Sequence, residues 1–532
     1  MADAGLAGRW RAAGRLATAC LVASAAVLAG CGTLPTNVGR VDSVALAPRS
    51  DSPLATIAAA SIPAPGLTGV RLLPLGAYSL EARIRLTEQA TTSLDVQYYV
   101  IENDPTGRLL LASLRDAALR GVRVRLLVDD LYTGHTDGLL RGLASFANVE
   151  VRLFNPFCCA RDAGLAGRFA ASLFDFGRLN HRMHNKLFIA DSVMAVAGGR
   201  NIANEYFLRA TEANFVDMDA FVMGAVVEEF STIFDRYWNS DVVYAIERIG
   251  EPIGDKAARR RAFDTEMAVM PAAPLDPPPN DVLGYGPLGE ELKFGRVGLI
   301  WAKANAFADP PTKLLSASPA IAYETSVTNN VMMTVWQAKD DLVLTSPYMI
   351  PGEKGMSSFR ALQENKVKVT VITNSLAATD EPLVHNGYSK YRLPMLRAGV
   401  DLYELSPTRV QRTKRLGVFG PSLGRLHAKT AVIDSKLVFI GSMNLDPRSA
   451  STNTEFGMFV DSPALAKELL RVLNISKLES AYRLRLSPEN ATLQWLTMDD
   501  DKEVILGIEP ESSFWFRFSN SLLGWFVPDQ LL

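Results

Sequence analysis

The stretch Leu426-His427-Ala428-Lys429-Thr430-Ala431-Val432-Ile433-Asp434, which runs on to Gly441-Ser442-Met443-Asn444, decides the fold. Its two short apolar runs, 430–433 and 437–440, flank a polar turn and predict a β-hairpin. His427 and Lys429 are two residues apart, so on a strand their side chains would share one face. An imidazole beside an ammonium group suits an anionic substrate, because one can attack or donate a proton while the other holds charge. The amide of Asn444 could bind a phosphate oxygen.

The same pattern occurs earlier in the chain as His184-Asn185-Lys186, Asp191 and Gly198-Gly199-Arg200-Asn201. In both copies the spacing is 2 from histidine to lysine, 5 from lysine to aspartate, 7 from aspartate to glycine and 3 from glycine to asparagine. A lone His-x-Lys is usually an incidental polar pair in a buried hairpin. A duplicated register of five residue types is instead a property of the whole fold.

At these residues the sequence resembles the phospholipase D superfamily, whose HxKxxxxDxxxxxxGSxN signature both copies follow. The resemblance implies an α/β fold of two pseudo-symmetric lobes, each a mixed β-sheet flanked by helices, that share one cleft. It implies a catalytic set of His184, Lys186, Asp191, His427, Lys429 and Asp434, with Asn201, Ser442 and Asn444 on the substrate phosphate. The first copy carries Gly199 where the pattern has serine, which leaves one phosphate contact fewer on that side. Asp191 and Asp434 fall at the hairpin turns, where fixing the loop is the alternative role.

Members of the superfamily orient each histidine with a carboxylate from the opposite lobe. The matching positions look like Glu455 for His184 and Asp217 for His427. By the same resemblance His184 is the nucleophile and His427 the acid and base. Lysines and asparagines would hold the phosphate charge, so we expect no cofactor and no metal.

The duplication extends beyond the motif. Strands predicted at 93–100 and 122–128 before the first motif recur as strands at 341–348 and 367–373 before the second. Another strand, 214–222, and an amphipathic helix ending at Trp238 close the first half. We expect a first lobe over 71–245, a Pro-rich linker over 246–325, a second lobe over 326–480 and a C-terminal extension over 481–532.

The N-terminal segment resembles a targeting signal. Arg9, Arg11 and Arg15 precede an apolar run, 16–28, that is too short to cross a bilayer but suits a secretory signal. The run ends in Leu28-Ala29-Gly30-Cys31, which resembles a bacterial lipoprotein box and implies that Cys31 is lipidated. Residues 1–31 are then a lipoprotein-type signal peptide and 32–70 a flexible spacer. We expect a protein anchored to a membrane and facing the periplasm, with the outer membrane favoured over the inner.

Two sets of charged residues, one basic and one acidic, lie near the first motif, and each can be interpreted in two ways. Arg161, Arg168 and Arg178, with apolar neighbours, precede the first motif and would suit anionic headgroups or lie on solvated loops. The pair Asp129-Asp130 is predicted to be solvated or capping rather than to hold a metal.

The segment 379–388 resembles bacterial cardiolipin synthases that lack N-terminal transmembrane helices. The implied reaction moves a phosphatidyl group onto phosphatidylglycerol, with phosphatidylethanolamine as a candidate second lipid. With water as acceptor, the same site would be a phospholipase D that makes phosphatidic acid. A nuclease uses the same signature, but a net charge of −2, from 55 basic and 57 acidic residues, shows no basic excess, so no nucleic-acid partner is expected. The oligomeric state is not predicted.

Overall fold

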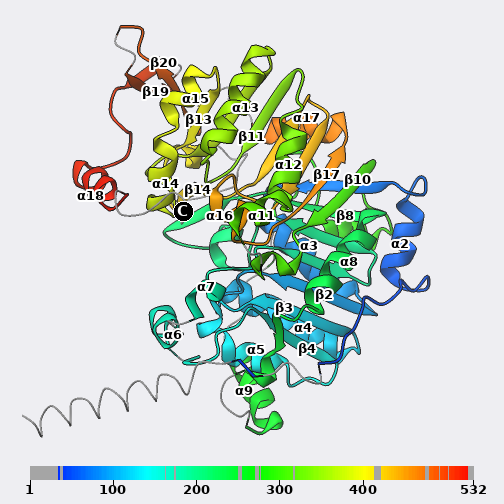
Figure 1. The fold of residues 1–532 in the computed structure, drawn as a ribbon. Helices are drawn as coiled ribbons and strands as arrows, with labels where there is room; N and C mark the ends of the chain where they lie inside the picture. The colour runs from blue at the N-terminus through cyan, green and yellow to red at the C-terminus, as the bar shows by residue number, and fades with distance from the viewer. Residues whose placement is uncertain are drawn as a thin grey trace, which may run out of the picture.

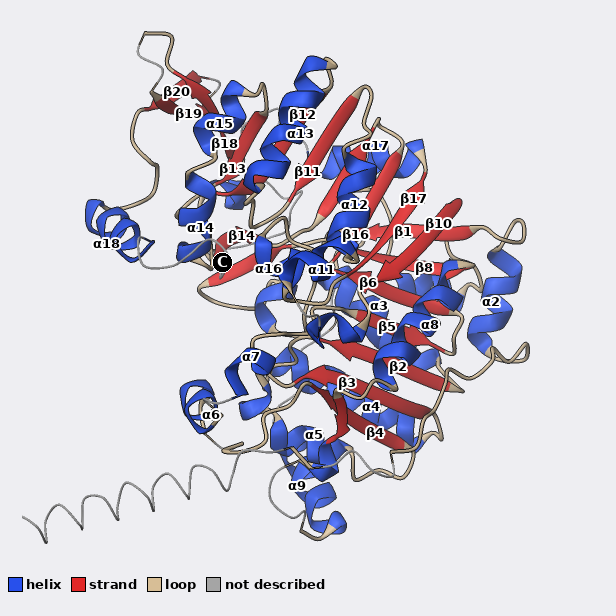
Figure 2. Cartoon of the chain, in the orientation of Figure 1, coloured by secondary structure: helices blue, strands red, loops and turns tan. Residues whose placement is uncertain are grey.

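The computed structural model describes residues 34–35, 40–161, 163–172, 175–249, 254–269, 275, 277–315, 318–412, 421–473, 479–489, 492–500 and 502–524. The predicted signal segment and Cys31 lie outside these ranges. Figure 1 shows the first half of the chain in the lower part of the molecule and the second half in the upper part. Each half is built on its own run of strands, which Figure 2 shows in red with helices around them.

The sheet of the first half has parallel strands in its middle and antiparallel strands on both sides. β2 pairs with β3 and β3 with β4 in parallel, while the other pairings are antiparallel. Apolar residues fill these strands because both faces of the sheet are covered. The spatial order is β1 (Thr68–Leu73), β8 (Asp219–Gly224), β6 (Met194–Gly198), β5 (Leu187–Ala190), β2 (Ser93–Tyr98), β3 (Arg123–Asp129), β4 (Val149–Phe154) and β9 (Val243–Ala245).

The sheet of the second half repeats that order. Its parallel strands are again the three that follow the motif hairpin in space, β11, β12 and β13. Two further strands extend its far edge. The order is β10 (Ile300–Ala308), β17 (Phe456–Asp461), β16 (Leu437–Gly441), β15 (Thr430–Ile433), β11 (Asp341–Thr345), β12 (Lys368–Asn374), β13 (Asp401–Leu405), β18 (Ala481–Leu486), β19 (Leu493–Asp499) and β20 (Lys502–Leu506). The sequence-based prediction of two pseudo-symmetric lobes is confirmed.

The two sheets join edge to edge. β1 pairs with β10 antiparallel, so the first strand of each lobe makes the junction. A second link is a parallel two-stranded ribbon of β7 (Ala213–Val216) and β14 (Leu423–Leu426), one strand from each half. β10 lies within the range predicted to be a Pro-rich linker, and β18 within the predicted C-terminal extension. Both ranges therefore contribute strands to the second sheet.

Helices cover the sheets and fill the space between them. α8 (Val226–Trp238) and α17 (Pro463–Leu473) contribute to one apolar core that also holds residues of both sheets. α3 (Gly76–Gln89) and α4 (Pro105–Leu119) cover the outer face of the first sheet, and α12 (Val327–Val335) and α13 (Gly352–Glu364) that of the second. A core shared in this way holds the lobes as one body.

The other helices are short or peripheral. They are α2 (Pro53–Ser61), α5 (Asp137–Leu143), α6 (Leu165–Ala171), α7 (Phe176–Leu179), α9 (Lys256–Val269), α10 (Leu288–Lys293), α11 (Pro319–Glu324), α14 (Pro382–Ser389), α15 (Arg392–Arg397), α16 (Pro447–Ser451) and α18 (Phe514–Gly524), with 3₁₀ turns η1 (Thr133–His135), η3 (Asn204–Phe207), η4 (Ile246–Arg248), η5 (Pro311–Leu315) and η6 (Arg409–Arg412). None of the helices in the described ranges is long and apolar enough to cross a membrane.

Two predictions about the first half need correction. The segment 40–70 is not a flexible spacer: Ser52 caps α2, whose Leu54 and Ile57 are buried, and the Ala45 amide donates to Asp235 at 2.8 Å. The apolar residues of α2 recur at helical spacing, a signal that the Ala/Pro/Ser-rich composition obscured. The strand predicted over 214–222 is broken between β7 and β8, because β7 pairs with β14 of the second half whereas β8 stays in the first sheet beside β6.

Candidate active site

The two histidines lie just before the motif hairpins rather than on them. β5 begins at Leu187 and β15 at Thr430, so neither His-x-Lys pair lies on a regular strand, as the hairpin pattern had suggested. Backbone bonds to the opposite half hold each histidine instead. The His184 amide donates to the Thr454 carbonyl at 2.9 Å, and the His427 amide donates to the Val216 carbonyl at 2.8 Å. Each imidazole is therefore positioned by the partner lobe, and neither half alone completes its own site.

The structure brings each imidazole together with a carboxylate from the other half. His184 Nδ1 lies 3.0 Å from Glu455 Oε2 and 3.0 Å from the Ser442 carbonyl oxygen. His427 Nδ1 lies 2.6 Å from Asp217 Oδ2. Oxygens of ionised carboxylates accept hydrogen bonds, so both Nδ1 atoms carry the proton and donate. That tautomer leaves the lone pair of each Nε2 free for chemistry.

The electrostatics of the pairs support this protonation pattern. Burial lowers the pKa of His184 to about 4, against the opposing effect of Glu455. Burial and the nearby Lys429 ammonium also lower the pKa of His427. Burial raises the pKa of Asp217, but the electrostatic interaction and the hydrogen bond with His427 outweigh burial, so that pKa lies below its usual range. Without substrate, the rings are neutral and the carboxylates ionised at neutral pH.

The motif lysines sit behind the histidines. Lys186 Nζ donates to the His184 carbonyl at 2.7 Å, and Lys429 Nζ donates to the His427 carbonyl at 2.5 Å. Both side chains are buried, and neither belongs to the cavity wall described below. Burial lowers the pKa of Lys429 to about 8 and that of Lys186 well below its usual value. Lys429 therefore holds positive charge beneath the His427 ring at neutral pH, and burial weakens the hold of both lysines on their protons.

The serine that distinguishes the two copies does not lie in the cavity wall. Ser442 Oγ donates to Glu455 Oε2 at 2.6 Å and is fully buried, so the hydroxyl predicted to bind substrate phosphate instead holds the orienting carboxylate. At the matching position a Cβ on Gly199 would lie 2.1 Å from Asp217 Oδ1. Glycine is required there because Asp217 occupies the space that a side chain would need.

The motif aspartates fix the hairpins and do not reach the histidines. Asp191 accepts hydrogen bonds from the backbone amides of 91–93, and Asp434 from those of 339–341. Both aspartates have positive φ, 52°, the left-handed turn conformation that aspartate tolerates. Their predicted place in the catalytic set is corrected: each ties its motif turn to the start of the neighbouring strand.

Both histidines line one cavity of about 540 Å³ between the lobes. Asn201 and Asn444 line it too, and the buried Asn444 Oδ1 has no hydrogen-bond partner, so it is free to meet a substrate group. Aromatic rings surround the imidazoles edge-on: Tyr99 lies 5.2 Å from His184, and Tyr206 lies 5.1 Å from His427, centroid to centroid. These contacts hold the imidazole rings in place.

Charged residues that the sequence analysis did not assign to the site also line the cavity. They are mostly acidic, with a single arginine, in the set Glu102, Glu205, Asp380, Glu381, Asp446 and Arg448. Burial raises the pKa of Asp446 to about 6 and shifts those of Glu102, Glu205 and Glu381 in the same direction. They come from loops and helix ends of both halves, so no spacing in the sequence could have grouped them. The outcome is a predominantly acidic cavity around two histidines.

The basic residues predicted near the mouth have other roles. Arg161 and Arg168 both pair with the buried Asp130 at 2.8 Å, and Arg182 pairs with Asp129 at 3.0 Å. The aspartate pair is therefore buried rather than solvated, but both carboxylates also accept backbone amides, from Met183 and Phe157 among others, as the alternative capping role predicted. A buried charge is costly unless it stays paired, so these arginines remain bound to the aspartates. Their role is to hold the loop before the first motif, and they do not bind a lipid headgroup.

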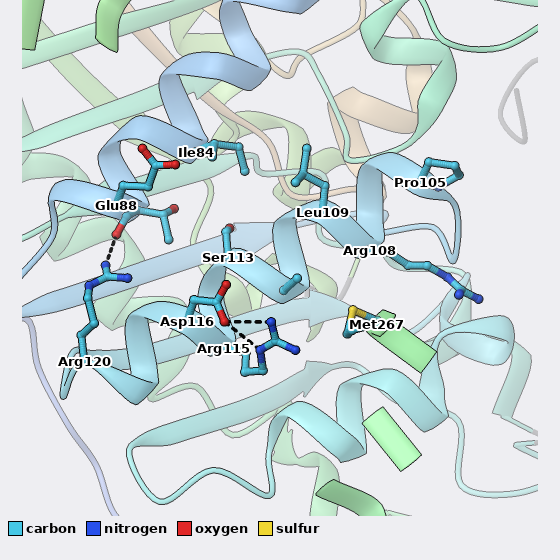
Figure 3. A pocket seen from close by; sticks show the side chains of 12 residues that line it. Ile84, Glu88, Pro105, Arg108, Leu109, Ser113, Arg115, Asp116, Arg120 and Met267 are labelled. Carbon is cyan, nitrogen blue, oxygen red and sulfur yellow. Dashed lines mark hydrogen bonds and ion pairs between the residues drawn. The ribbon is translucent and has the colours of Figure 1, made fainter. Parts of the chain in front are cut away.

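A second hollow, of about 290 Å³, lies on the first lobe between α3 and α4 (Figure 3). Its charged side chains are satisfied locally, since Arg120 donates to the Thr87 carbonyl at 2.6 Å and Arg115 pairs with Asp116 at 2.8 Å. No histidine lines it. Across the described part of the chain, no group of three or more His, Cys, Asp or Glu side chains is placed to hold a metal ion.

The fold and the site define a phospholipase D-like protein with one histidine motif in each lobe. A family model described as "Cardiolipin synthase, PLD-like domain" matches residues 84–238 and 332–475, one range in each lobe. Cardiolipin synthase C of Escherichia coli (strain K12) is similar to this chain, with 38% identity over 467 residues, 85% of this chain and 94% of the relative. The chain belongs to the phospholipase D-like cardiolipin synthase family.

One further relative and one solved structure are also similar to most of this chain. An uncharacterised protein of Helicobacter pylori (strain ATCC 700392 / 26695) is 30% identical over 466 residues, 85% of this chain and 87% of that protein. The crystal structure of phosphatidylserine synthase from Haemophilus influenzae Rd KW20 is similar in fold, with a TM-score of 0.54 and 14% sequence identity over 86% of this chain and 92% of that one. At that identity the likeness concerns the fold alone.

Proposed function

We propose that this protein synthesises cardiolipin by moving a phosphatidyl group from one phospholipid to the hydroxyl of phosphatidylglycerol. The observation that carries the proposal is the pair of imidazoles, each held at Nδ1 by a carboxylate of the opposite lobe, in the wall of one cavity. The name of the E. coli relative supports the same reaction.

The reaction runs in two displacements. His184 Nε2 attacks the phosphorus of the donor phosphodiester, the bond to the headgroup oxygen breaks, and protonated His427 gives its Nε2 proton to the departing alcohol. His427 then accepts the proton of the incoming hydroxyl, whose oxygen attacks phosphorus and breaks the bond to His184. The Nδ2 groups of Asn201 and Asn444 donate to the phosphate oxygens, and Lys186 and Lys429 supply charge from behind.

The division of roles follows from the charges that face each ring. The carboxylates of Asp217 and Asp380 both raise the pKa of His427, which favours the ring that must carry a proton. His184 faces one carboxylate and two lysines, and its pKa of about 4 keeps it neutral and nucleophilic. A phosphodiester anion between the rings raises the proton affinity of both, and the carboxylates of Asp217 and Asp380 favour placing the proton on His427.

The acidic wall supports phosphatidylethanolamine as the second lipid and argues against nucleic acid. An ammonium headgroup would be attracted to Glu102, Glu205, Asp380 and Glu381, whereas a strand of phosphates would be repelled by them. The cavity therefore suits a single phosphodiester that carries a cationic or hydroxylated headgroup.

The test is incubation of the purified chain with phosphatidylglycerol alone, phosphatidylethanolamine alone and both, with cardiolipin resolved from phosphatidic acid. We expect cardiolipin, most of it with both lipids present, and none with His184→Ala. Phosphatidic acid as the main product in every mixture would identify a hydrolase and refute the transferase assignment. Turnover retained in His184→Ala or in His427→Ala would refute the two-histidine scheme.

The membrane attachment is a separate part of the proposal. The family acts at membranes, and the Leu28–Cys31 box supports a lipoprotein that faces the periplasm. Mass spectrometry of the mature N-terminus should show an acylated Cys31, and Cys31→Ala should abolish acylation. An unmodified Cys31 in membrane-isolated protein would contradict this anchor.

A further inference from the structure

The C-terminal helix α18 presents an uncovered aromatic face. Phe514, Trp515, Phe518 and Leu522 are 63%, 73%, 53% and 49% exposed. The rings contact one another: the centroid of Phe514 lies 5.5 Å from that of Trp515 and 6.3 Å from that of Phe518. Single exposed apolar residues are normal on a protein surface, but a contiguous cluster of large rings marks an interaction site.

The helix is oriented so that this face points away from the protein. Asn520, only 5% exposed, donates from Nδ2 to Asn386 Oδ1 at 2.8 Å, and Asn386 Nδ2 donates back to the Asn520 carbonyl at 2.5 Å. At 100° per residue, Phe518 and Leu522 lie nearly opposite Asn520, and Trp515 lies close to them. The polar side of α18 is thus docked and its apolar side faces outward, the reverse of the usual arrangement.

The docking partner of α18 connects it to the catalytic cavity. Asn386 belongs to α14, and Leu383 and Val384 of the same helix line that cavity. In Figure 1, α14 and α18 lie at the left edge of the molecule, the same edge as α6 and α7 of the first lobe. On that opposite lobe Tyr132, which lines the cavity, and Phe176 of α7 are 41% and 51% exposed. Apolar side chains therefore flank the cavity on both lobes.

We propose that the aromatic face of α18 inserts into the headgroup region of a phospholipid bilayer and holds the catalytic cavity against it. Tryptophan and phenylalanine on one face of a short helix are typical of interfacial membrane binding. α18 has no acidic residue and carries Arg517, which suits an anionic lipid surface. The choice of a bilayer as the binding partner rests on the proposed function, because the lipid substrates of that reaction reside in a bilayer.

The first experiment measures insertion directly. Total binding to vesicles is not the readout, because the N-terminal segment can tether the full chain by itself. Instead, vesicles of phosphatidylglycerol and phosphatidylethanolamine with brominated acyl chains are mixed with the full chain and with Trp515→Phe. We expect stronger quenching of tryptophan fluorescence in the unaltered chain than in Trp515→Phe. Equal quenching in the two would overturn the proposal.

The second experiment separates docking from chemistry. The double variant Trp515→Ser with Phe518→Ser should turn over vesicle lipid about tenfold or more slower, given the apolar area lost from the interface. Its rate on short-chain phosphatidylglycerol below the micelle-forming concentration should be unchanged, which also shows that it folds. Phe294→Ser, at an 80% exposed phenylalanine outside α18 and outside the cavity wall, is the matched control and should slow neither reaction.

Three further outcomes are informative. Equal slowing on vesicles and on monomeric lipid would overturn the proposal, because it would make α18 a part of the catalytic fold. A dimer that dissociates in the double variant, with vesicle turnover intact, would also overturn it and identify a second copy of the chain as the occupant. Selective quenching at Trp515 without any cardiolipin formation would support membrane docking while refuting the proposed function.

Discussion

Restoring the family's serine at position 199 should damage this enzyme rather than improve it. A Cβ there would lie 2.1 Å from Asp217 Oδ1, whereas ordinary contact begins at 3.4 Å, so the carboxylate has to withdraw by about 1.3 Å. Asp217 Oδ2 lies 2.6 Å from His427 Nδ1, and the same movement breaks that bond or turns the ring. A misplacement of about 1 Å in a catalytic group can cost about 10²-fold in rate. We therefore expect Gly199→Ser to lower kcat about 100-fold, or about 2.7 kcal/mol in activation free energy.

The assay is cardiolipin formation from phosphatidylglycerol and phosphatidylethanolamine at saturating lipid, with thermal unfolding measured in parallel. Gly138→Ser is the matched control, because a Cβ on Gly138 meets no atom within 4 Å and that residue lies outside the site. The control should keep its kcat. Gly199→Ser with unchanged kcat would refute the reasoning, since it would mean that the Asp217 to His427 contact tolerates displacement or does not matter.

Four other outcomes follow from the same geometry. Asp217→Asn should lower kcat by about 10²- to 10⁴-fold with little change in KM, because an amide cannot stabilise a protonated His427; a kcat within threefold would contradict that role. Burial lowers the pKa of His184 to about 4, and the ring must be neutral to attack, so kcat/KM should fall as the pH drops toward 4. Glu455→Gln removes a carboxylate that raises this pKa and should move the acid limb of the pH profile to lower pH. An acid limb that stays in place would count against His184 as nucleophile. With its pKa of about 8, Lys429 should lose its charge above that pH, so kcat/KM should fall on the alkaline side, and Lys429→Arg, if active, should lack this limb because arginine stays protonated. Asp191→Ala leaves backbone amides without their acceptor. A denaturant titration should show a free energy of unfolding lower by about 1–3 kcal/mol, while kcat stays within a few-fold. A large loss of kcat in a stable Asp191→Ala would return that residue to the catalytic set.

The sequence was sufficient for the residues whose roles depend on local spacing. The duplicated register placed His184 and His427 in matched hairpins, and the apolar runs at 430–433 and 437–440 became β15 and β16 almost residue for residue. Glu455 and Asp217 were assigned by resemblance, and the structure puts each beside the histidine expected for it. Such features are readable because hairpin geometry and strand periodicity repeat over short distances along the chain.

Other assignments failed where a role depends on atoms distant in sequence. Ser442 holds a carboxylate, the Asp129-Asp130 pair is buried against arginines, and the predicted linker supplies β10. In each case the residue type allowed more than one environment, and burial decided among them.

The sequence by itself determined that the chain is a duplicated α/β protein with two equivalent imidazole motifs, because both properties depend on local residue patterns. Only the tertiary structure decided which lobe supports which ring, why Gly199 cannot be serine, and which carboxylates surround the cavity. These depend on the edge-to-edge joining of β1 and β10 and on the shared core, which bring residues 210 and 271 positions apart into contact. The sign of the local charge in the cavity arises from that packing.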